Sequence, residues 1–281
     1  MSHGNLMPPD QESGSGMGPI VRGRPVYRCF AGLPAREYFL YLPTTRPDSD
    51  RVLVLVHGIS RNAIEQCLQF QDIAQRSGVA LIAPVYAADT YRNYQQVIDG
   101  RRGTRADTAL IDILDDAAAY AGIQTRQVAL FGFSGGAQFA HRFTFLHPDR
   151  VNACVCVAAG WYTFPDPRRQ FPRGMATHPL AEGFFDAERI SSIPMHVMVG
   201  ADDTERDPAL RSDPELDALQ GTTRVMRAER WMRALRQWGT HAQSSFEVIP
   251  GVGHSFREVA EHGALAERVF RRLGWEGGAG S

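Results

Sequence analysis

Lysine is absent from this sequence of 281 residues, so all 30 residues in its Lys and Arg total are arginine. The absence excludes a Ser-Lys catalytic dyad, a Schiff base on lysine and the lysine of a P-loop. We attribute the arginine bias itself to genomic base composition, so only these exclusions bear on function.

Cysteine is scarce. The four cysteines include no C-x-x-C pair, and none lies at zinc-ligand spacing from a histidine, so no metal site is expected. Cys154 and Cys156 lie two positions apart in the β-like run 151–159, which places both side chains on one face of a strand. We interpret them as buried core thiols, with a functional pair as the open alternative.

Long apolar runs are also missing. No stretch of about 18 apolar residues occurs, so no membrane span is expected. Residues 1–20 are rich in Ser, Gly and Pro but lack the basic and apolar regions of a signal peptide. We therefore expect a cytoplasmic protein with a disordered tail at 1–20, either native or a linker, and a flexible tail at 276–281.

Neither sign of charge is in excess. Asp and Glu total 31 against the 30 arginines, and the formal net charge is -1. Such a balance creates no field that would attract nucleic acid or an anionic membrane. The length and the 43% apolar content fit one α/β domain over residues 21–275. The expected partner is a small, largely uncharged molecule, and a homodimer stays open.

The most informative feature that is present is a G-x-S-x-G pattern, Gly132-Phe133-Ser134-Gly135-Gly136. It follows a short apolar, β-like run and precedes a helical pattern. Glycines allow the strand and the helix to approach closely around a tight turn, which would expose the serine hydroxyl. Because a free hydroxyl is a weak nucleophile, a catalytic serine also requires a histidine base, an acid and an oxyanion site.

Candidates for the acid and the base follow the serine in the chain. Two aspartates, Asp202 and Asp203, come after a strand-like run that ends at Gly200. We prefer Asp203, because the Gly-x-x-Asp spacing places it one step past the turn, whereas Asp202 suits a turn-stabilising role. Asp202 remains the alternative. The predicted base is His254, which lies in a glycine-containing loop after the last strand-like run.

The oxyanion site is predicted from two backbone amides. One should belong to the residue after the nucleophile, Gly135, and the other to the loop that follows the early strand. That loop is the segment 57–60, in which Ile59 is the expected donor. His57 is expected to brace the loop, since it precedes the nucleophile by a long stretch of chain.

Strand-like and helix-like patterns alternate from residue 26 onward, which predicts a parallel sheet with helices on both faces. Strands are expected near 26–30, 36–42, 52–56, 79–84, 127–133, 151–159, 195–200 and 246–249, the first two as an antiparallel edge. Helices are expected near 62–77, 105–121, 135–147 and 224–238, followed by a terminal helix that reaches about 273. The helix at 224–238 is predicted to hold its arginines in solvent.

Residues 160–190 form a segment that is long for a plain connection and rich in aromatic side chains. We predict a lid or cap that covers the site, with Trp161, Tyr162 and Phe164 as candidate substrate-binding residues. Packing of these aromatics as ordinary core stays open as an alternative.

Across residues 26–273 the chain resembles the α/β-hydrolase superfamily. The resemblance rests on His57-Gly58, the G-x-S-x-G pattern, Asp203 and His254. It implies a mostly parallel eight-stranded sheet flanked by helices and a Ser, acid, His triad in that chain order. The segment 57–63 is similar to the oxyanion loop of polyhydroxybutyrate-depolymerase-like and feruloyl-esterase-like members.

This resemblance implies a serine hydrolase that cleaves a small-molecule carboxylic ester through an acyl-enzyme, with no metal or organic cofactor. Two alternatives stay open. One is hydrolysis of an amide, thioester or carbon-carbon bond by the same triad. The other is a non-catalytic scaffold of this fold that binds a ligand.

Overall fold

Five consecutive aliphatic residues form β3 (Val52–Val56), and each is buried because helices cover both faces of the sheet around it. The computed structural model of the protein describes residues 19–32, 34–45, 50–99, 104–176, 185–239 and 243–276. The other strands of this eight-stranded sheet are β1 (Val26–Phe30), β2 (Arg36–Tyr41), β4 (Ala80–Pro84), β7 (Val128–Phe133), β8 (Val151–Val157), β9 (Met195–Gly200) and β10 (Ser245–Ile249).

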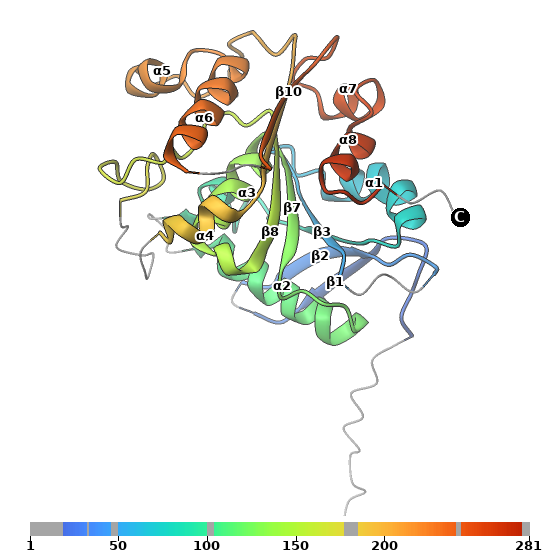
Figure 1. Cartoon of the computed structure of the whole chain (residues 1–281). Helices are drawn as coiled ribbons and strands as arrows, with labels where there is room; N and C mark the ends of the chain where they lie inside the picture. Colours follow the sequence, from blue (N-terminus) through green and yellow to red (C-terminus); the bar gives the residue numbers. More distant parts are fainter. Residues whose placement is uncertain are drawn as a thin grey trace, which may run out of the picture.

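The strands follow the order β1-β2-β4-β3-β7-β8-β9-β10 across the sheet (Figure 1). Strand β2 pairs antiparallel with β1 and with β4, and all the other neighbouring pairs are parallel. The predicted mostly parallel sheet with an antiparallel edge is thus confirmed. Since the parallel strands all end on the same side, the loops after β3, β7 and β9 can meet there.

Helices lie on both faces of the sheet (Figure 1). One face is covered by α1 (Ala63–Ser77), α7 (Phe256–Glu261) and α8 (Leu265–Arg272). The other is covered by α2 (Ala106–Ala121), α3 (Gly135–Leu146), α4 (Ala187–Ser192) and α6 (Arg224–Trp238), with α5 (Pro214–Gln220) packed beside α6. Short elements complete the fold: η1 (Tyr94–Gln96), β5 (Ile98–Asp99), β6 (Thr104–Arg105) and η2 (Pro148–Arg150).

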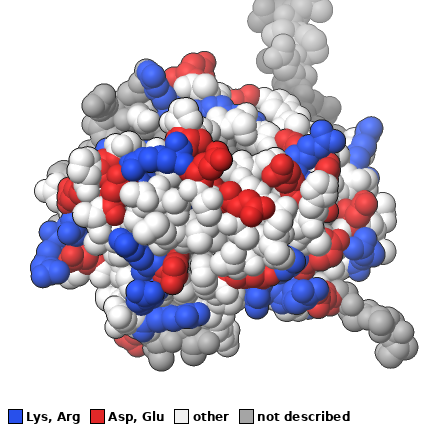
Figure 2. Space-filling model, turned by 90° about the horizontal axis from the view of Figure 1, so that it is seen from above, with Lys and Arg blue, Asp and Glu red and all other residues white. Residues whose placement is uncertain are grey.

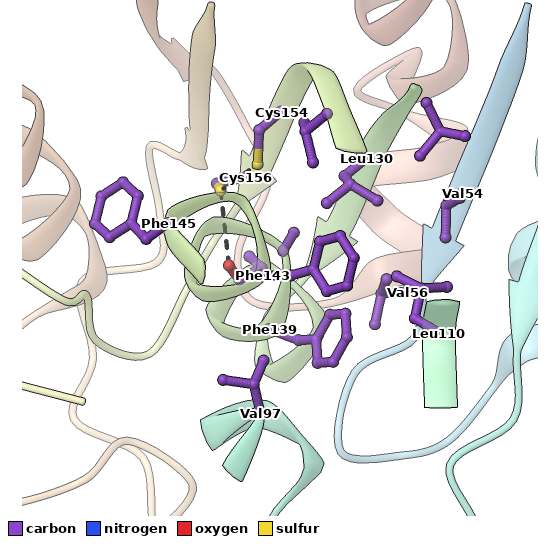
Figure 3. Packing of buried hydrophobic residues seen from close by; sticks show 14 of the residues in the cluster. Val54, Val56, Val97, Leu110, Leu130, Phe139, Phe143, Phe145, Cys154 and Cys156 are labelled. Atoms are coloured by element: carbon purple, nitrogen blue, oxygen red, sulfur yellow. Dashed lines mark hydrogen bonds between the residues drawn. The ribbon is translucent and has the colours of Figure 1, made fainter. Parts of the chain in front are cut away.

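Alternate residues of the central strands supply two separate cores. Val54 and Val56 of β3 face α2 and α3, whereas Leu53 and Leu55 face α1 and α8. Figure 3 shows the first core, in which aromatic side chains of α3 pack with apolar side chains of the sheet and of α2. This alternation follows from the two-residue period of a strand, and it explains why a strand covered on both faces is wholly apolar.

Cys154 and Cys156 lie in the first core, as predicted. Both are buried, their sulfur atoms are 3.6 Å apart, and neither forms a disulfide. The Cys156 thiol donates to the carbonyl oxygen of Ala137 in α3, the contact drawn as a dashed line in Figure 3. Burial raises the pKa of the Cys156 thiol, which keeps it protonated and unreactive.

The structure corrects the sequence prediction at three helices. Helix α4 begins inside the segment predicted as an irregular insert, and α5 lies in the predicted polar loop after β9; each starts at an aspartate N-cap. The predicted terminal helix is two helices, α7 and α8. The chain breaks between them at Gly263, where a Cβ atom would lie 2.5 Å from the carbonyl oxygen of Val259, and at Ala264, which has φ 46.

The predicted solvent exposure of the arginines in α6 is wrong for two of them. Arg224 and Arg227 are buried, at 1% and 0% exposure, whereas Arg233 and Arg236 lie in solvent. Buried arginines require hydrogen-bond acceptors or anions, and both have them, as described below.

Some predictions fall outside the described residues: 1–18 of the expected N-terminal tail, 177–184 of the aromatic segment and 277–281 of the C-terminal tail. Among the residues that are described, no helix has both the length and the apolar character needed to cross a membrane. On the face seen in Figure 2, arginine and acidic side chains are interspersed among uncharged surface.

Candidate active site

A sharp turn joins β7 to α3, and Ser134 is its single residue between the strand and the helix. Ser134 has φ 54 and ψ -112, a backbone conformation that is strained for a residue with a Cβ atom. Its N–H donates to the carbonyl oxygen of Val157 in β8, 2.8 Å away, which holds the turn against the neighbouring strand. The side chain of Ser134 remains partly exposed.

Two glycines make this turn possible. A Cβ atom on Gly132 would lie 2.2 Å from the carbonyl group of Gly136, and one on Gly136 would lie 1.9 Å from the carbonyl oxygen of Val56. Real Cβ atoms do not approach other atoms so closely, so the helix can pack on the strands here only without side chains. The spacing of the G-x-S-x-G pattern therefore has a steric cause.

Ser134, His254 and Asp203 form a continuous chain of hydrogen bonds. His254 Nε2 lies 3.0 Å from Ser134 Oγ, and His254 Nδ1 lies 2.8 Å from Asp203 Oδ2. A carboxylate only accepts, so Nδ1 carries the ring proton and Nε2 is free to accept the serine proton. Asp203 is 3% exposed, and Asp202 lies in solvent, so Asp203 is the carboxylate that contacts the histidine.

Loop contacts bring the acid and the histidine together. A Cβ atom on Gly200, at the end of β9, would lie 2.2 Å from the carbonyl oxygen of Val252. That oxygen accepts a hydrogen bond from Asp202 N at 3.1 Å, so the turn after β9 is tied to the loop after β10. The ring of His254 stacks on Phe133, with the centroids 5.3 Å apart, which fixes its orientation toward Ser134.

Arg224 contacts Oδ1 of Asp203, the carboxylate oxygen that does not contact His254. Its Nη1 donates to Asp203 Oδ1 at 3.0 Å and to Asp207 Oδ2 at 2.6 Å. Hydrogen bonding to Arg224 holds the pKa of Asp207 below its usual range. Both oxygens of Asp203 therefore have charged or polar partners, one from α6 and one from the histidine loop.

The backbone of Ile59 lies next to Gly135, the residue that follows Ser134. A Cβ atom on Gly135 would stand 3.4 Å from Ile59 N and 3.0 Å from Ile59 Cγ2. Within the described part of the chain, neither the Ile59 amide nor the Gly135 amide donates to a protein acceptor. Gly135 is the first residue of α3, so its N–H has no partner inside the helix and can bind an anion.

Buried side chains hold the loop that carries Ile59. His57 Nε2 accepts from Tyr86 N at 3.1 Å, so Nδ1 carries the proton and donates to the carbonyl oxygen of Gly58 at 2.8 Å. Burial lowers the pKa of His57 to about 4, and the ring is neutral at neutral pH. The Tyr94 hydroxyl donates to the His57 carbonyl oxygen at 2.6 Å. His57 thus braces the loop, as the sequence predicted.

The three predicted substrate-binding aromatics lie in different surroundings. Trp161 is 6% exposed and packs against the Arg142 guanidinium, 3.8 Å from its ring centroid. Tyr162 is fully buried and stacks on Trp231, so it has no accessible surface for a substrate. Phe164 lines a separate hollow of about 270 Å³ beside the end of α6. Core packing, the alternative left open above, describes Tyr162.

Sequence reasoning missed Arg224 and Tyr94. Arg224 had a detectable signal, because positions 224, 228, 231 and 235 follow the spacing of one helix face and the last three are buried. Tyr94 had none, since it lies in the short helix η1 and reaches the loop that carries Ile59 only through the tertiary fold. Among the described residues, no group of three or more His, Cys, Asp or Glu side chains could hold a metal ion.

No protein-family model matches the sequence, and no curated protein matches it either. Solved structures do match. Poly(aspartic acid) hydrolase-1 from Sphingomonas sp. KT-1 is 23% identical, with a TM-score of 0.75, and the match covers 89% of this chain and 100% of that one. A poly(3-hydroxybutyrate) depolymerase from Bordetella parapertussis is 24% identical, with a TM-score of 0.71, and the match covers 88% of this chain and 90% of that one.

A ferulic acid esterase is also similar, at 17% identity and a TM-score of 0.62, and the match covers 90% of this chain and 98% of that one. These likenesses and the topology of the sheet define the architecture. The chain has the α/β-hydrolase fold.

Proposed function

We propose that the protein is a serine hydrolase that cleaves a carboxylic ester through an acyl-enzyme on Ser134. The observation that carries this proposal is the unbroken series of contacts from Ser134 Oγ through His254 to Asp203, at 3.0 and 2.8 Å. The strained serine conformation adds support, because strain of this kind persists where the surrounding structure enforces it and is common at active sites.

In the acylation step, His254 Nε2 accepts the Ser134 proton while Oγ bonds to the ester carbonyl carbon. The carbonyl oxygen gains negative charge, and the amides of Ile59 and Gly135 donate hydrogen bonds to it. The intermediate then expels the alkoxide, which takes the proton from His254 and leaves as an alcohol. Asp203 stays ionised and orients the imidazolium throughout.

In the deacylation step, water repeats the sequence. His254 removes a proton from the water as its oxygen attacks the acyl carbon, and the bond to Ser134 Oγ breaks. Ser134 recovers its proton from His254, and the carboxylic acid leaves. Trp161, which follows β8 and is 6% exposed, is the lining residue that we favour for the acyl group.

A second candidate keeps the triad and changes the bond. One of the similar structures is a poly(aspartic acid) hydrolase, and the name of its substrate denotes a chain of amides rather than esters. The depolymerase and the esterase instead act on esters. Because two of these three point to esters, ester hydrolysis is the first choice and amide hydrolysis the second.

The test combines covalent labelling with a substrate panel. We expect a fluorophosphonate to label the purified protein at Ser134, and we expect p-nitrophenyl acyl esters to be hydrolysed faster than aminoacyl amides of the same acyl group. Replacing Ser134→Ala should abolish labelling and lower kcat by roughly a million-fold. Ser191→Ala, on α4, is the matched control and should behave like the wild type.

Three outcomes would contradict the proposal. Ester hydrolysis by Ser134→Ala at the wild-type rate would remove Ser134 from the chemistry. Failure of the folded wild-type protein to react with the fluorophosphonate would favour a ligand-binding scaffold instead. Rapid amide cleavage with negligible ester cleavage would make the second candidate correct.

A further inference from the structure

A buried arginine faces the acid of the proposed triad. Arg224 is the first residue of α6, is 1% exposed, and directs Nη1 at Asp203 Oδ1, 3.0 Å away. The other oxygen of Asp203 contacts His254. The same Nη1 also contacts Asp207, whose side chain is 34% exposed. Charges of alternating sign therefore run from Asp207 through Arg224 and Asp203 to the histidine.

The ion pair lies where solvent screens it poorly. Arg224 and Asp203 have side-chain exposures of 1% and 2%, and charges in such surroundings interact more strongly than exposed ones. Burying an arginine costs desolvation energy, so its presence needs a reason beyond net stability. The exposed pair between Arg233 and Glu229 on the same helix shows the usual alternative, in which both partners stay in water.

The surroundings of His254 come from four parts of the chain. Ser134 and the Phe133 ring belong to the elbow, which is the sharp turn between β7 and α3, and Asp203 belongs to the loop after β9. Arg224 acts from α6 through Asp203. From α7, the Glu258 carboxylate accepts a hydrogen bond from Gly253 N at 3.3 Å, beside the histidine in the chain.

We propose that Arg224 is a positioning residue that sets the pH range in which His254 works as the base, and that Asp207 moderates its effect. This inference rests on the proposed function and deepens it. Arg224 holds Asp203 through one oxygen so that the other stays aimed at Nδ1. Its positive charge also offsets part of the negative charge that would stabilise a protonated imidazole.

The sign of the effect follows from this arrangement. A protonated imidazole cannot act as a base, so the rate falls on the acid side of the plot of rate against pH. This side of the plot is the acid limb. Removing the positive charge of Arg224 leaves Asp203 and Asp207 free to stabilise the protonated ring, and the acid limb should move to higher pH. Removing the negative charge of Asp207 leaves Arg224 less compensated, and the limb should move to lower pH.

A merely structural role makes a different prediction. If Arg224 only anchored α6 to the loop after β9, its loss would lower the folded fraction or the melting temperature. The pH dependence of the remaining active sites would not change, and Asp207→Asn would have no effect opposite to that of an Arg224 variant. The direction of the two shifts therefore separates the two roles.

The experiment measures kcat/KM for p-nitrophenyl butyrate and the rate of fluorophosphonate labelling between pH 5 and 9. The variants are Arg224→Met, Arg224→Lys and Asp207→Asn, with Arg233→Met as the matched control. Rates are divided by the concentration of active sites titrated with the fluorophosphonate, so loss of folded protein does not count as loss of rate.

We expect Arg224→Met to move the acid limb up by about one pH unit, which is the usual scale for one nearby charge. Arg224→Lys keeps the charge, so its acid limb should stay at the wild-type pH although its kcat is lower. Asp207→Asn should move the acid limb to lower pH. Arg233→Met should change neither quantity.

Identical acid limbs in the wild type, Arg224→Met and Asp207→Asn would overturn the proposal. If Arg224→Met does not fold, the direction of the Asp207→Asn shift decides alone, and an unchanged or upward shift would refute it. Failure of the proposed function is a separate result, because it would appear as wild-type activity in Ser134→Ala.

Discussion

Arg227 Nη1 donates a hydrogen bond of 2.6 Å to the carbonyl oxygen of Gly160, which lies 67 positions away in the sequence. The guanidinium is fully buried and also contacts the Gly221 and Arg211 carbonyl oxygens and the Asp217 carboxylate. One side chain of α6 thus joins the segment before Trp161 to the loop that precedes α5.

Replacing Arg227→Met should lower the free energy of unfolding by about 3 to 5 kcal/mol, because the change leaves buried carbonyl oxygens without their donor and removes one of the two arginines that bind Asp217. Urea denaturation followed by circular dichroism measures this. Arg236→Met, at an exposed position of the same helix, should stay within about 0.5 kcal/mol of the wild type. Equal stability of the two variants would contradict the structural role of Arg227.

Gly136→Ala should damage the elbow. The added methyl group would meet the Val56 carbonyl oxygen at 1.9 Å, so α3 must move away from β3. We expect a loss of about 1 to 3 kcal/mol in unfolding free energy and slower labelling of Ser134 by the fluorophosphonate. In Gly253→Ala the methyl group would meet only Glu258 Oε2, at 3.7 Å, and the variant should fold normally. Normal labelling of Gly136→Ala would show that the elbow tolerates the side chain.

Tyr94→Phe should loosen the loop that carries Ile59. The change removes the hydrogen bond to the His57 carbonyl oxygen, and a lost bond of this kind costs about 1.4 kcal/mol, a tenfold change in rate when it acts on the transition state. We expect kcat/KM for a p-nitrophenyl ester to fall about tenfold with little change in folding. Tyr91→Phe removes a hydroxyl that binds Arg36 in the same core and should keep full activity. An unaffected rate in Tyr94→Phe would refute this role of Tyr94.

Stability should decline as the pH falls below 6.5. Burial lowers the pKa of His196 to about 4, so the unfolded chain binds a proton there in a range where the folded chain does not. Its contribution is complete above pH 6.5 and is lost as the pH falls toward 4. Between pH 7.5 and pH 5 this residue alone accounts for about 2 kcal/mol. The measurement is urea unfolding of the wild type and His196→Gln at both values, and an equal pH dependence of the two would contradict the assignment.

Much of the fold could be predicted from local patterns. The buried run of β3 and the alternation of strands and helices gave the sheet and its faces, because burial on both sides demands an unbroken apolar strand. The ends of α7 and α8 and the presence of α4 and α5 could not be read in this way. Short helices depend on single caps and on packing against neighbours more than on periodicity.

The sequence by itself determined the chemical identity of the candidate site. The glycines around Ser134, the aspartate after β9 and the histidine after β10 are written in order along the chain, and their spacing suffices because turns and strand ends obey local steric rules.

Only the tertiary structure decided which aspartate contacts His254, and only it brought Arg224 to Asp203 and Tyr94 to His57. These contacts join residues 51, 21 and 37 positions apart. Whether such groups meet depends on how the sheet, helices and loops pack in three dimensions. No local pattern of the chain encodes a contact between residues so far apart in the sequence.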